Sequence, residues 1–139
     1  MGAIVSIGTA NPEFRHNQDE IMQFMLEARP EEDHSSRQKI NILHSRSSIN
    51  SRYSILEDFS SKTNKSFFDE SVTMPGVSER MALFKKGALP LSLKAIENCL
   101  SQVSDFNLKS ITHLITVSCT GLSAPGLDFE ITEHLKLNP

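Results

Sequence analysis

Hydrophobic and polar residues follow two different periods along this chain, which predicts both strands and helices. The runs Ala3–Ile7 and Ile111–Val117 are continuous in apolar and β-branched residues, a pattern typical of strands buried on both faces of a parallel sheet. Ser51–Leu56 alternates loosely and predicts a further short strand. A strand that is buried on both faces needs neighbouring strands and covering helices, and the two or three strands predicted here barely supply them. We therefore expect this sequence to end partway through a larger sheet.

Apolar residues at intervals of three and four predict four helices. Asn17 followed by Glu20 has the spacing of a capping box, which starts the first helix, and Pro30 is expected to end it. The other three are expected over Ser36–Ser47, Ser78–Gln102 and Leu127–Leu137. Pro90 inside the long helix predicts a kink, because proline removes one backbone hydrogen bond. The succession of strand, long helix, strand and helix favours the α/β class.

A polar segment, Glu57–Gly76, leads from the short strand to the long helix. A loop of about twenty residues is long for a compact domain, and such loops are usually functional or mobile. Phe67 and Phe68 lie in its middle. We expect these two rings to anchor the loop against the rest of the protein.

Composition and charge exclude several classes of protein. With 14 basic and 17 acidic residues the net charge is −3, so the chain lacks the basic excess of an electrostatic nucleic-acid binder. No apolar run is long enough to predict a membrane span. Cys99 and Cys119 form no disulfide framework, and we interpret them as thiols of a cytoplasmic protein. The histidines lack metal-ligand spacing, so neither a metal nor a cofactor is expected.

Two groups of residues are candidates for chemistry. Cys119 follows the run Ile111–Val117 and lies in a small-residue loop, 118–126, at the kind of strand end where open α/β sheets carry active sites. The pattern alone leaves open a nucleophile, a pocket-lining thiol or a buried thiol. Lys39 and Arg46 are seven residues apart and share one helix face. They form either a solvated surface or a clamp for phosphate groups.

Four short motifs together resemble one family. Gly8–Pro12 is similar to the opening of type III polyketide synthases, the chalcone and stilbene synthase family, and Ser51–Tyr53 resembles the arginine-tyrosine start of one of its strands. Thr112–Ile115 followed by Cys119–Asp128 resembles the family's strand and Pro-Gly loop, and this match is the most specific. The resemblance covers the whole chain but only the first part of a family member.

The resemblance implies an α/β protein with the N-terminal part of a thiolase-like fold over residues 1–139. It also implies an acyltransferase that acts as a homodimer, loads a starter from acyl-CoA onto a cysteine and extends it with malonyl-CoA. In the family this cysteine, and the histidine and asparagine that assist it, belong to positions beyond those matched here. No catalytic residue is therefore expected among these residues, and the chain alone is expected to be inactive.

The resemblance also gives roles to the small-residue loop. Cys119 and Thr120 match the threonine-serine pair that lines the substrate pocket of plant members, and the cysteine departs from that pattern. Ala124 matches a methionine that reaches into the cavity of the partner subunit, and its bond to Pro125 is expected to be cis, as in the family. Because alanine is much shorter than methionine, we expect it to contribute less to that wall.

Lys39 and Arg46 match two of the three basic positions that bind the phosphates of CoA in the family. Ile42 occupies the third position. The missing charge is expected to weaken the site and leaves room for another thioester carrier, such as an acyl carrier protein. The resemblance favours the phosphate clamp over the solvated surface.

Two other functions stay open from the sequence. One is a different thiolase-fold condensing enzyme, such as ketoacyl synthase III or hydroxymethylglutaryl-CoA synthase, although the Ala-Pro-Gly loop argues against both. The other is a non-catalytic module that binds acyl thioesters or dimerises with a full-length synthase. A reading frame that continues into a strand with a Gly-Cys step favours the enzyme, and a stop codon after Pro139 favours the module.

Overall fold

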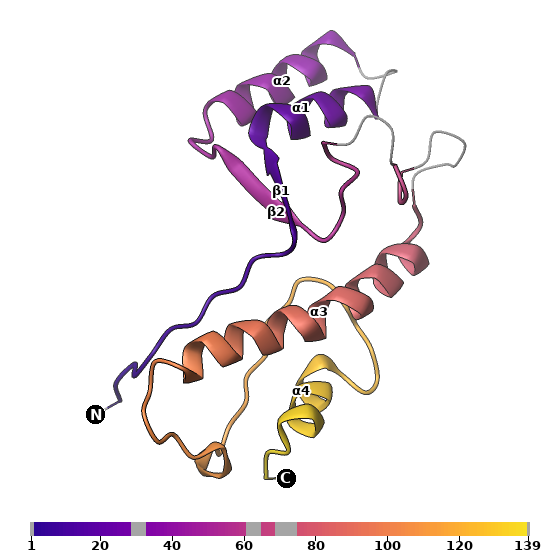
Figure 1. Ribbon diagram of the computed structural model, residues 1–139. Helices are drawn as coiled ribbons and strands as arrows, with labels where there is room; N and C mark the ends of the chain where they lie inside the picture. Colours follow the sequence, from indigo (N-terminus) through magenta and orange to yellow (C-terminus); the bar gives the residue numbers. More distant parts are fainter. Residues whose placement is uncertain (1, 29–32, 61–64, 69–74, 139) are drawn as a thin grey trace. The chain divides into compact units, whose positions relative to one another are not determined.

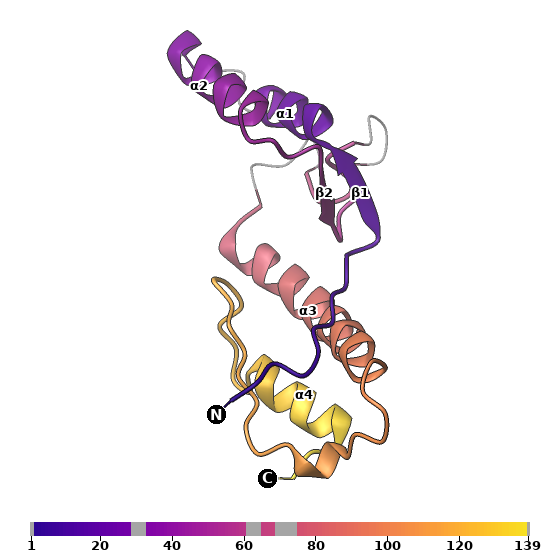
Figure 2. The same ribbon diagram turned by 90° about the vertical axis from the view of Figure 1, so that its left-hand side faces the viewer.

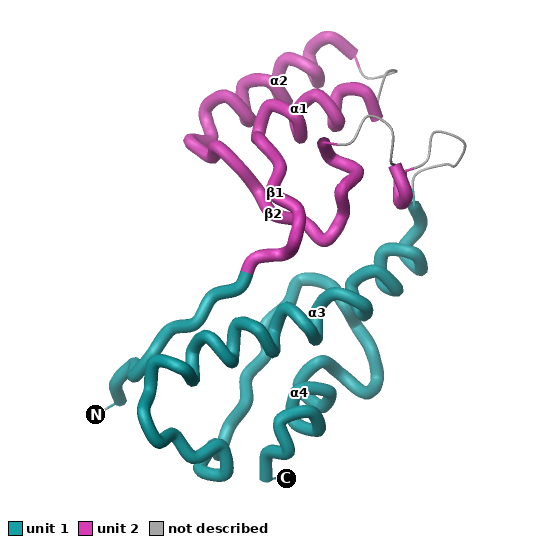
Figure 3. Tube along the Cα trace, in the orientation of Figure 1, with its two compact units in different colours: residues 1–10, 75–139 teal, residues 11–74 magenta. Residues whose placement is uncertain are grey.

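Figure 1 shows the computed structural model, which describes residues 2–28, 33–60, 65–68 and 75–138. The chain divides into two compact units, a β unit (residues 11–74) and a helical unit (residues 1–10 and 75–139), which Figure 3 colours separately. The β unit contains β1 (Phe14–Asn17), α1 (Gln18–Glu27), α2 (His34–Ser45) and β2 (Ser51–Ser54). The helical unit contains α3 (Val77–Leu100), the short 3-10 helix η1 (Leu108–Ser110) and α4 (Leu127–Leu135).

The β unit is built on a two-stranded antiparallel ribbon. β1 pairs with β2 so that Asn17 lies opposite Ser51, and the backbone N–H of Gln18 adds a 3.0 Å hydrogen bond to Asn50 O. The helices α1 and α2 pack against each other next to this ribbon (Figures 1 and 2). β2 was predicted from the sequence, whereas β1 was not, because its Phe-Arg-His-Asn sequence lacks a clear apolar alternation.

Side-chain caps start both helices of the β unit. The Glu20 carboxylate accepts a 2.9 Å hydrogen bond from the backbone N–H of Asn17, and the predicted capping box of α1 is confirmed. Asp33 accepts a 2.7 Å hydrogen bond from the backbone N–H of Ser36 at the start of α2. Pro30, the expected end of the first helix, lies outside the described residues.

Aromatic rings form the core of the β unit. Phe24 of α1 is buried and makes edge-to-face contacts with Phe59 and Phe68, with 5.1 Å between ring centroids in each pair. Phe67 contacts Phe68 in the same way at 5.2 Å. The prediction that Phe67 and Phe68 anchor the polar loop is therefore confirmed.

A buried carboxylate fixes the same loop. Asp58 is 0% exposed, and it accepts hydrogen bonds from the backbone N–H groups of Phe67 (2.8 Å) and Phe68 (2.9 Å) and from Ser66 Oγ (3.3 Å). Burial alone raises the pKa of Asp58, but the hydrogen bonds to its charged form outweigh burial and hold the pKa below its usual range. An ionised side chain therefore ties this part of the loop together.

In the helical unit, residues 6–9 lie along α3 (Figures 1 and 2). The hydrogen bonds between them join Ser6 Oγ to Cys99 Sγ (2.9 Å), Asn98 Nδ2 to Thr9 O (2.8 Å) and Gln102 Nε2 to Ile7 O (2.8 Å). The side chain of Cys99 is half-buried at this contact. Gly8 permits the close approach, because a Cβ there would overlap the backbone of Ala95 and Cys99.

The last two of the four helices predicted from the sequence are confirmed. α3 and α4 each lie within two residues of the expected bounds. α4 packs against α3, with Ile131 only 2% exposed. α3 continues through Pro90, and the kink expected there stays a prediction. Across the parts of the chain that the structure describes, no helix combines the length and apolar character needed to span a membrane.

Two predicted strands are wrong. Neither Ala3–Ile7 nor Ile111–Val117 is paired into a sheet, and side chains expected to be buried are exposed, with Ile4 at 83% and Val117 at 93%. Apolar β-branched residues favour extended backbone, but a strand also needs hydrogen bonds to a neighbouring strand. Within the described residues, these two segments have no such neighbour.

Candidate functional site

The small-residue loop begins with a side-chain turn. Ser118 Oγ donates a 2.7 Å hydrogen bond to Thr120 O and accepts one of 3.2 Å from the Thr120 N–H, which folds the backbone around Cys119. Cys119 is a free, exposed thiol, and Thr120 is also exposed. The expected cis bond between Ala124 and Pro125 is confirmed, and both residues are exposed.

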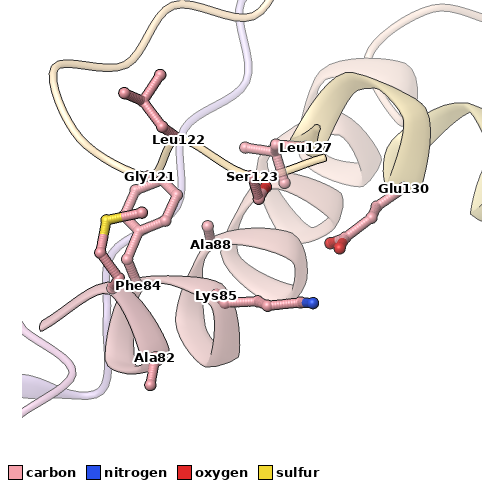
Figure 4. A pocket seen from close by; sticks show the side chains of 10 residues that line it. Ala82, Phe84, Lys85, Ala88, Gly121, Leu122, Ser123, Leu127 and Glu130 are labelled. Atoms are coloured by element: carbon pink, nitrogen blue, oxygen red, sulfur yellow. The ribbon is translucent and has the colours of Figure 1, made fainter. Parts of the chain in front are cut away.

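The middle of this loop covers a cavity of about 180 Å³ between α3 and α4 (Figure 4). Its apolar wall includes Met81, Phe84, Ala88, Gly121, Leu122 and Leu127. Lys85 and Glu130 contribute charged groups to the lining. The cavity has room for a small apolar group, but neither Cys119 nor Thr120 lines it.

Gly121 allows the loop to approach α3. Its φ of 86° lies in the left-handed region, and a Cβ there would overlap the ring of Phe84. We expect Gly121→Ala to lower the free energy of unfolding by about 2 kcal/mol, because it adds backbone strain and displaces the ring. Chemical denaturation measures this loss. In a Phe84→Leu background the loss is expected to be smaller, and an equal loss in both backgrounds would show that the ring plays no part.

Lys39 of α2 and Arg46, the C-cap residue of α2, are both exposed and lie on one face with Ile42 and Leu43. Ile42 is 43% exposed and Leu43 is 71% exposed, so this face has a cation at each end and an aliphatic surface between them. α2 contains no acidic residue that would compete for these cations. The face can bind phosphate oxygens through its cations and apolar groups through its middle.

The candidate residues of α2 and of the small-residue loop belong to different units, the former to the β unit and the latter to the helical unit. Sequence reasoning missed the group that holds the end of α2. Gln18 is 7% exposed, and its amide contacts His44, Ser47 and Arg52. These partners are 26 to 34 residues away from Gln18, and no local motif marks them. Only tertiary structure brings them together.

Comparison with known proteins identifies the family. The family model of the N-terminal domain of chalcone and stilbene synthases matches residues 1–139. The chain belongs to the chalcone and stilbene synthase family. The resemblance seen in the four sequence motifs is thereby confirmed.

Solved structures of type III polyketide synthases share the fold of this chalcone and stilbene synthase family member. PKS-I from the brown alga Ectocarpus siliculosus is 27% identical with a TM-score of 0.78, over 98% of this chain and 36% of that one. The fungal type III polyketide synthase ORAS is 20% identical with a TM-score of 0.77, over 98% of this chain and 34% of that one. The C-terminal type III domain of Steely1, a type I/III hybrid from Dictyostelium, is 21% identical with a TM-score of 0.72, over 97% of this chain and 36% of that one.

These matches confirm the expected thiolase-like α/β fold. The chain spans about a third of the length of the proteins it matches. The roles of the individual loop and α2 residues stay predictions.

Proposed function

We propose that this chain is the N-terminal domain of a type III polyketide synthase-like acyltransferase, which condenses an acyl-CoA starter with malonyl-CoA in the cytoplasm. The observation that carries the proposal is the family match over the whole chain, together with a 27% identical polyketide synthase of the same fold. The free thiols of Cys99 and Cys119 fit a reducing compartment.

In this proposal residues 1–139 supply binding surfaces for substrate and for the second subunit. Residues outside this range carry out the covalent acyl transfer. Within the described part of the chain, neither thiol has a histidine or another base as a hydrogen-bond partner, and Cys99 meets only the Ser6 hydroxyl. A cysteine that acts as a nucleophile usually has an adjacent base that takes its proton. We therefore assign no catalytic residue to residues 1–139 and expect them alone to be inactive.

In the proposal, residues of the small-residue loop form part of the wall of the substrate pocket. Cys119 and Thr120 are exposed on a loop whose turn is held by Ser118, and they line the pocket for the growing chain. Ala124 and Pro125, also exposed, contact the second subunit of a homodimer and border its cavity. A cysteine side chain makes that wall less polar than a threonine hydroxyl would.

The α2 face binds the phosphates of CoA. Its two cations lie about 10 Å apart along the axis, because seven residues rise by 1.5 Å each, so they suit separate phosphate groups. Ile42 between them removes the third positive charge but offers an apolar contact. The aliphatic surface therefore suits the pantetheine arm better than another phosphate.

The test of the function uses the protein encoded by the complete reading frame. It is incubated with malonyl-CoA and aromatic or long-chain acyl-CoA starters, and products are identified by mass spectrometry. Products longer than the starter by decarboxylated malonyl units support the proposal. Binding of acyl-CoA without any product would overturn it in favour of the non-catalytic binding module.

In the same protein, Lys39→Ala and Arg46→Ala are each expected to raise KM for malonyl-CoA about tenfold with little change in kcat, because each removes a phosphate contact remote from the reacting carbon. Steady-state kinetics measure the two constants. Lys94→Ala is the matched control, an exposed lysine on α3. Unchanged KM values in both variants would remove the phosphate clamp from the proposal.

A further inference from the structure

Gln18 is a buried amide whose hydrogen-bonding groups all have partners. It is the first residue of α1 and is 7% exposed. Its Nε2 lies 3.1 Å from His44 Nδ1 and 3.4 Å from Ser47 Oγ, and its Oε1 accepts a 3.1 Å hydrogen bond from Arg52 Nε. Both amide donors and the carbonyl oxygen are therefore used, which a buried amide requires.

Two of these partners lie on either side of Arg46. Arg46 is the C-cap of α2, where the helix ends, and His44 and Ser47 flank it in the sequence. Ser47 Oγ also donates a 2.8 Å hydrogen bond to His44 O and accepts one of 3.2 Å from the Ile49 N–H. The backbone that carries Arg46 is thus held by one connected set of hydrogen bonds that ends at Gln18.

The other side of Gln18 is fixed to the ribbon. Its backbone N–H is hydrogen-bonded to Asn50 O at 3.0 Å, and its Oε1 is bonded to Arg52, a residue of β2. The ribbon itself is held by the pairing of β1 with β2. Gln18 therefore joins the last turn of α2 to the most regular part of the β unit.

We propose that Gln18 is a positioning residue for the phosphate contact of Arg46, an inference that rests on the proposed function of α2. A long arginine side chain reaches a phosphate at the correct point only if its backbone is fixed, since an unfixed helix end adds conformational entropy that binding must remove. Neither a leucine nor a glutamate replaces the amide, because leucine has no polar atom and glutamate lacks the two donors.

The test is Gln18→Leu in the protein of the complete reading frame. KM for malonyl-CoA is expected to rise about fivefold with kcat within about twofold of the parent. KM for the malonyl thioester of N-acetylcysteamine, which has no phosphate, is expected to stay unchanged. Gln23→Leu is the matched control, because Gln23 is an exposed glutamine on the same helix whose amide donates a hydrogen bond to Glu27.

A double variant separates positioning from general destabilisation. In an Arg46→Ala background, Gln18→Leu is expected to cause no further rise in KM, because the contact that it positions is already lost. If Arg46→Ala raises KM and Gln18→Leu behaves like Gln23→Leu, the inference is wrong and the clamp stands. If Arg46→Ala itself has no effect, the proposed clamp is wrong. If Gln18→Leu does not fold, Ser47→Ala replaces it as the test. This variant removes one hydrogen-bond partner of the Gln18 amide and is also expected to raise KM for malonyl-CoA.

Discussion

Replacing Gly8 with alanine is expected to lower the free energy of unfolding by about 3 kcal/mol, the largest stability loss that we expect from a single methyl group here. The added Cβ would overlap the backbone of Ala95 and Cys99 in α3, and backbone atoms inside a helix cannot move aside as a side chain can. The segment must instead move away, which breaks its hydrogen bonds to Cys99, Asn98 and Gln102. Urea denaturation followed by circular dichroism measures the loss.

Gly2→Ala is the control for this experiment. Its added Cβ has no atom within 4 Å, so its effect on the free energy of unfolding is expected to be close to zero. Equal stability of the Gly8 and Gly2 variants would contradict the contact between the N-terminal segment and α3. Ser6→Ala removes only the hydrogen bond to Cys99 and leaves the backbone of the segment in place against α3. Its loss of unfolding free energy is therefore expected to lie between those of the Gly2 and Gly8 variants.

The second large effect is expected at Asp58. Asp58→Asn preserves the shape of the side chain but removes its charge, and we expect a loss of about 3 kcal/mol at pH 7 because buried hydrogen bonds to a carboxylate are replaced by weaker or missing ones. The Phe67 and Phe68 N–H groups lose an ionised acceptor. Glu57→Gln, an exposed neighbour, is the control and is expected to change stability little.

The pH dependence has a definite sign. The folded-state pKa of Asp58 is lowered, so its contribution to stability is fully present above the pKa of the unfolded chain and is lost as pH falls through the folded pKa. The difference in unfolding free energy between the parent and Asp58→Asn should therefore be constant near neutral pH. It should narrow below about pH 4, where the unfolded aspartate begins to take up protons. A difference that widens in acid would refute the assigned shift.

The sequence predicts the helices of this protein well because their signals are local. The capping box of Asn17 and Glu20 and the apolar spacing of α3 each lie within a few residues, and helix hydrogen bonds are made within the same segment. The runs Ala3–Ile7 and Ile111–Val117 failed as strands because their hydrogen bonds depend on distant partners. β1 was missed because its own sequence has no clear strand pattern. It forms a strand because it pairs with β2, which is distant in the sequence.

The site residues differ in the same way: those marked by a local motif were predicted, and those held by distant partners were not. Loop residues such as Ala124 and Pro125 follow from a contiguous motif, and their cis bond was predicted. Gln18 could not be predicted, because its partners lie 26 to 34 residues away, at the end of α2 and in β2, and nothing near it in the sequence distinguishes it from a solvated glutamine. His16 is similar: it is 1% exposed, with its ring nitrogens 2.8 Å from Ser60 Oγ and from Leu56 O.

The contact of residues 6–9 with α3 also has a consequence for synthesis on the ribosome. Ser6 and Cys99 are 93 positions apart, and at about 5–20 residues per second their meeting is delayed by about 5 to 20 s after Ser6 has been made. Throughout that interval Ser6, Ile7 and Thr9 lack the α3 residues to which they are hydrogen-bonded in the fold, and the whole β unit is translated within it. The segment that is translated first therefore completes its native contacts only after α3 has been synthesised.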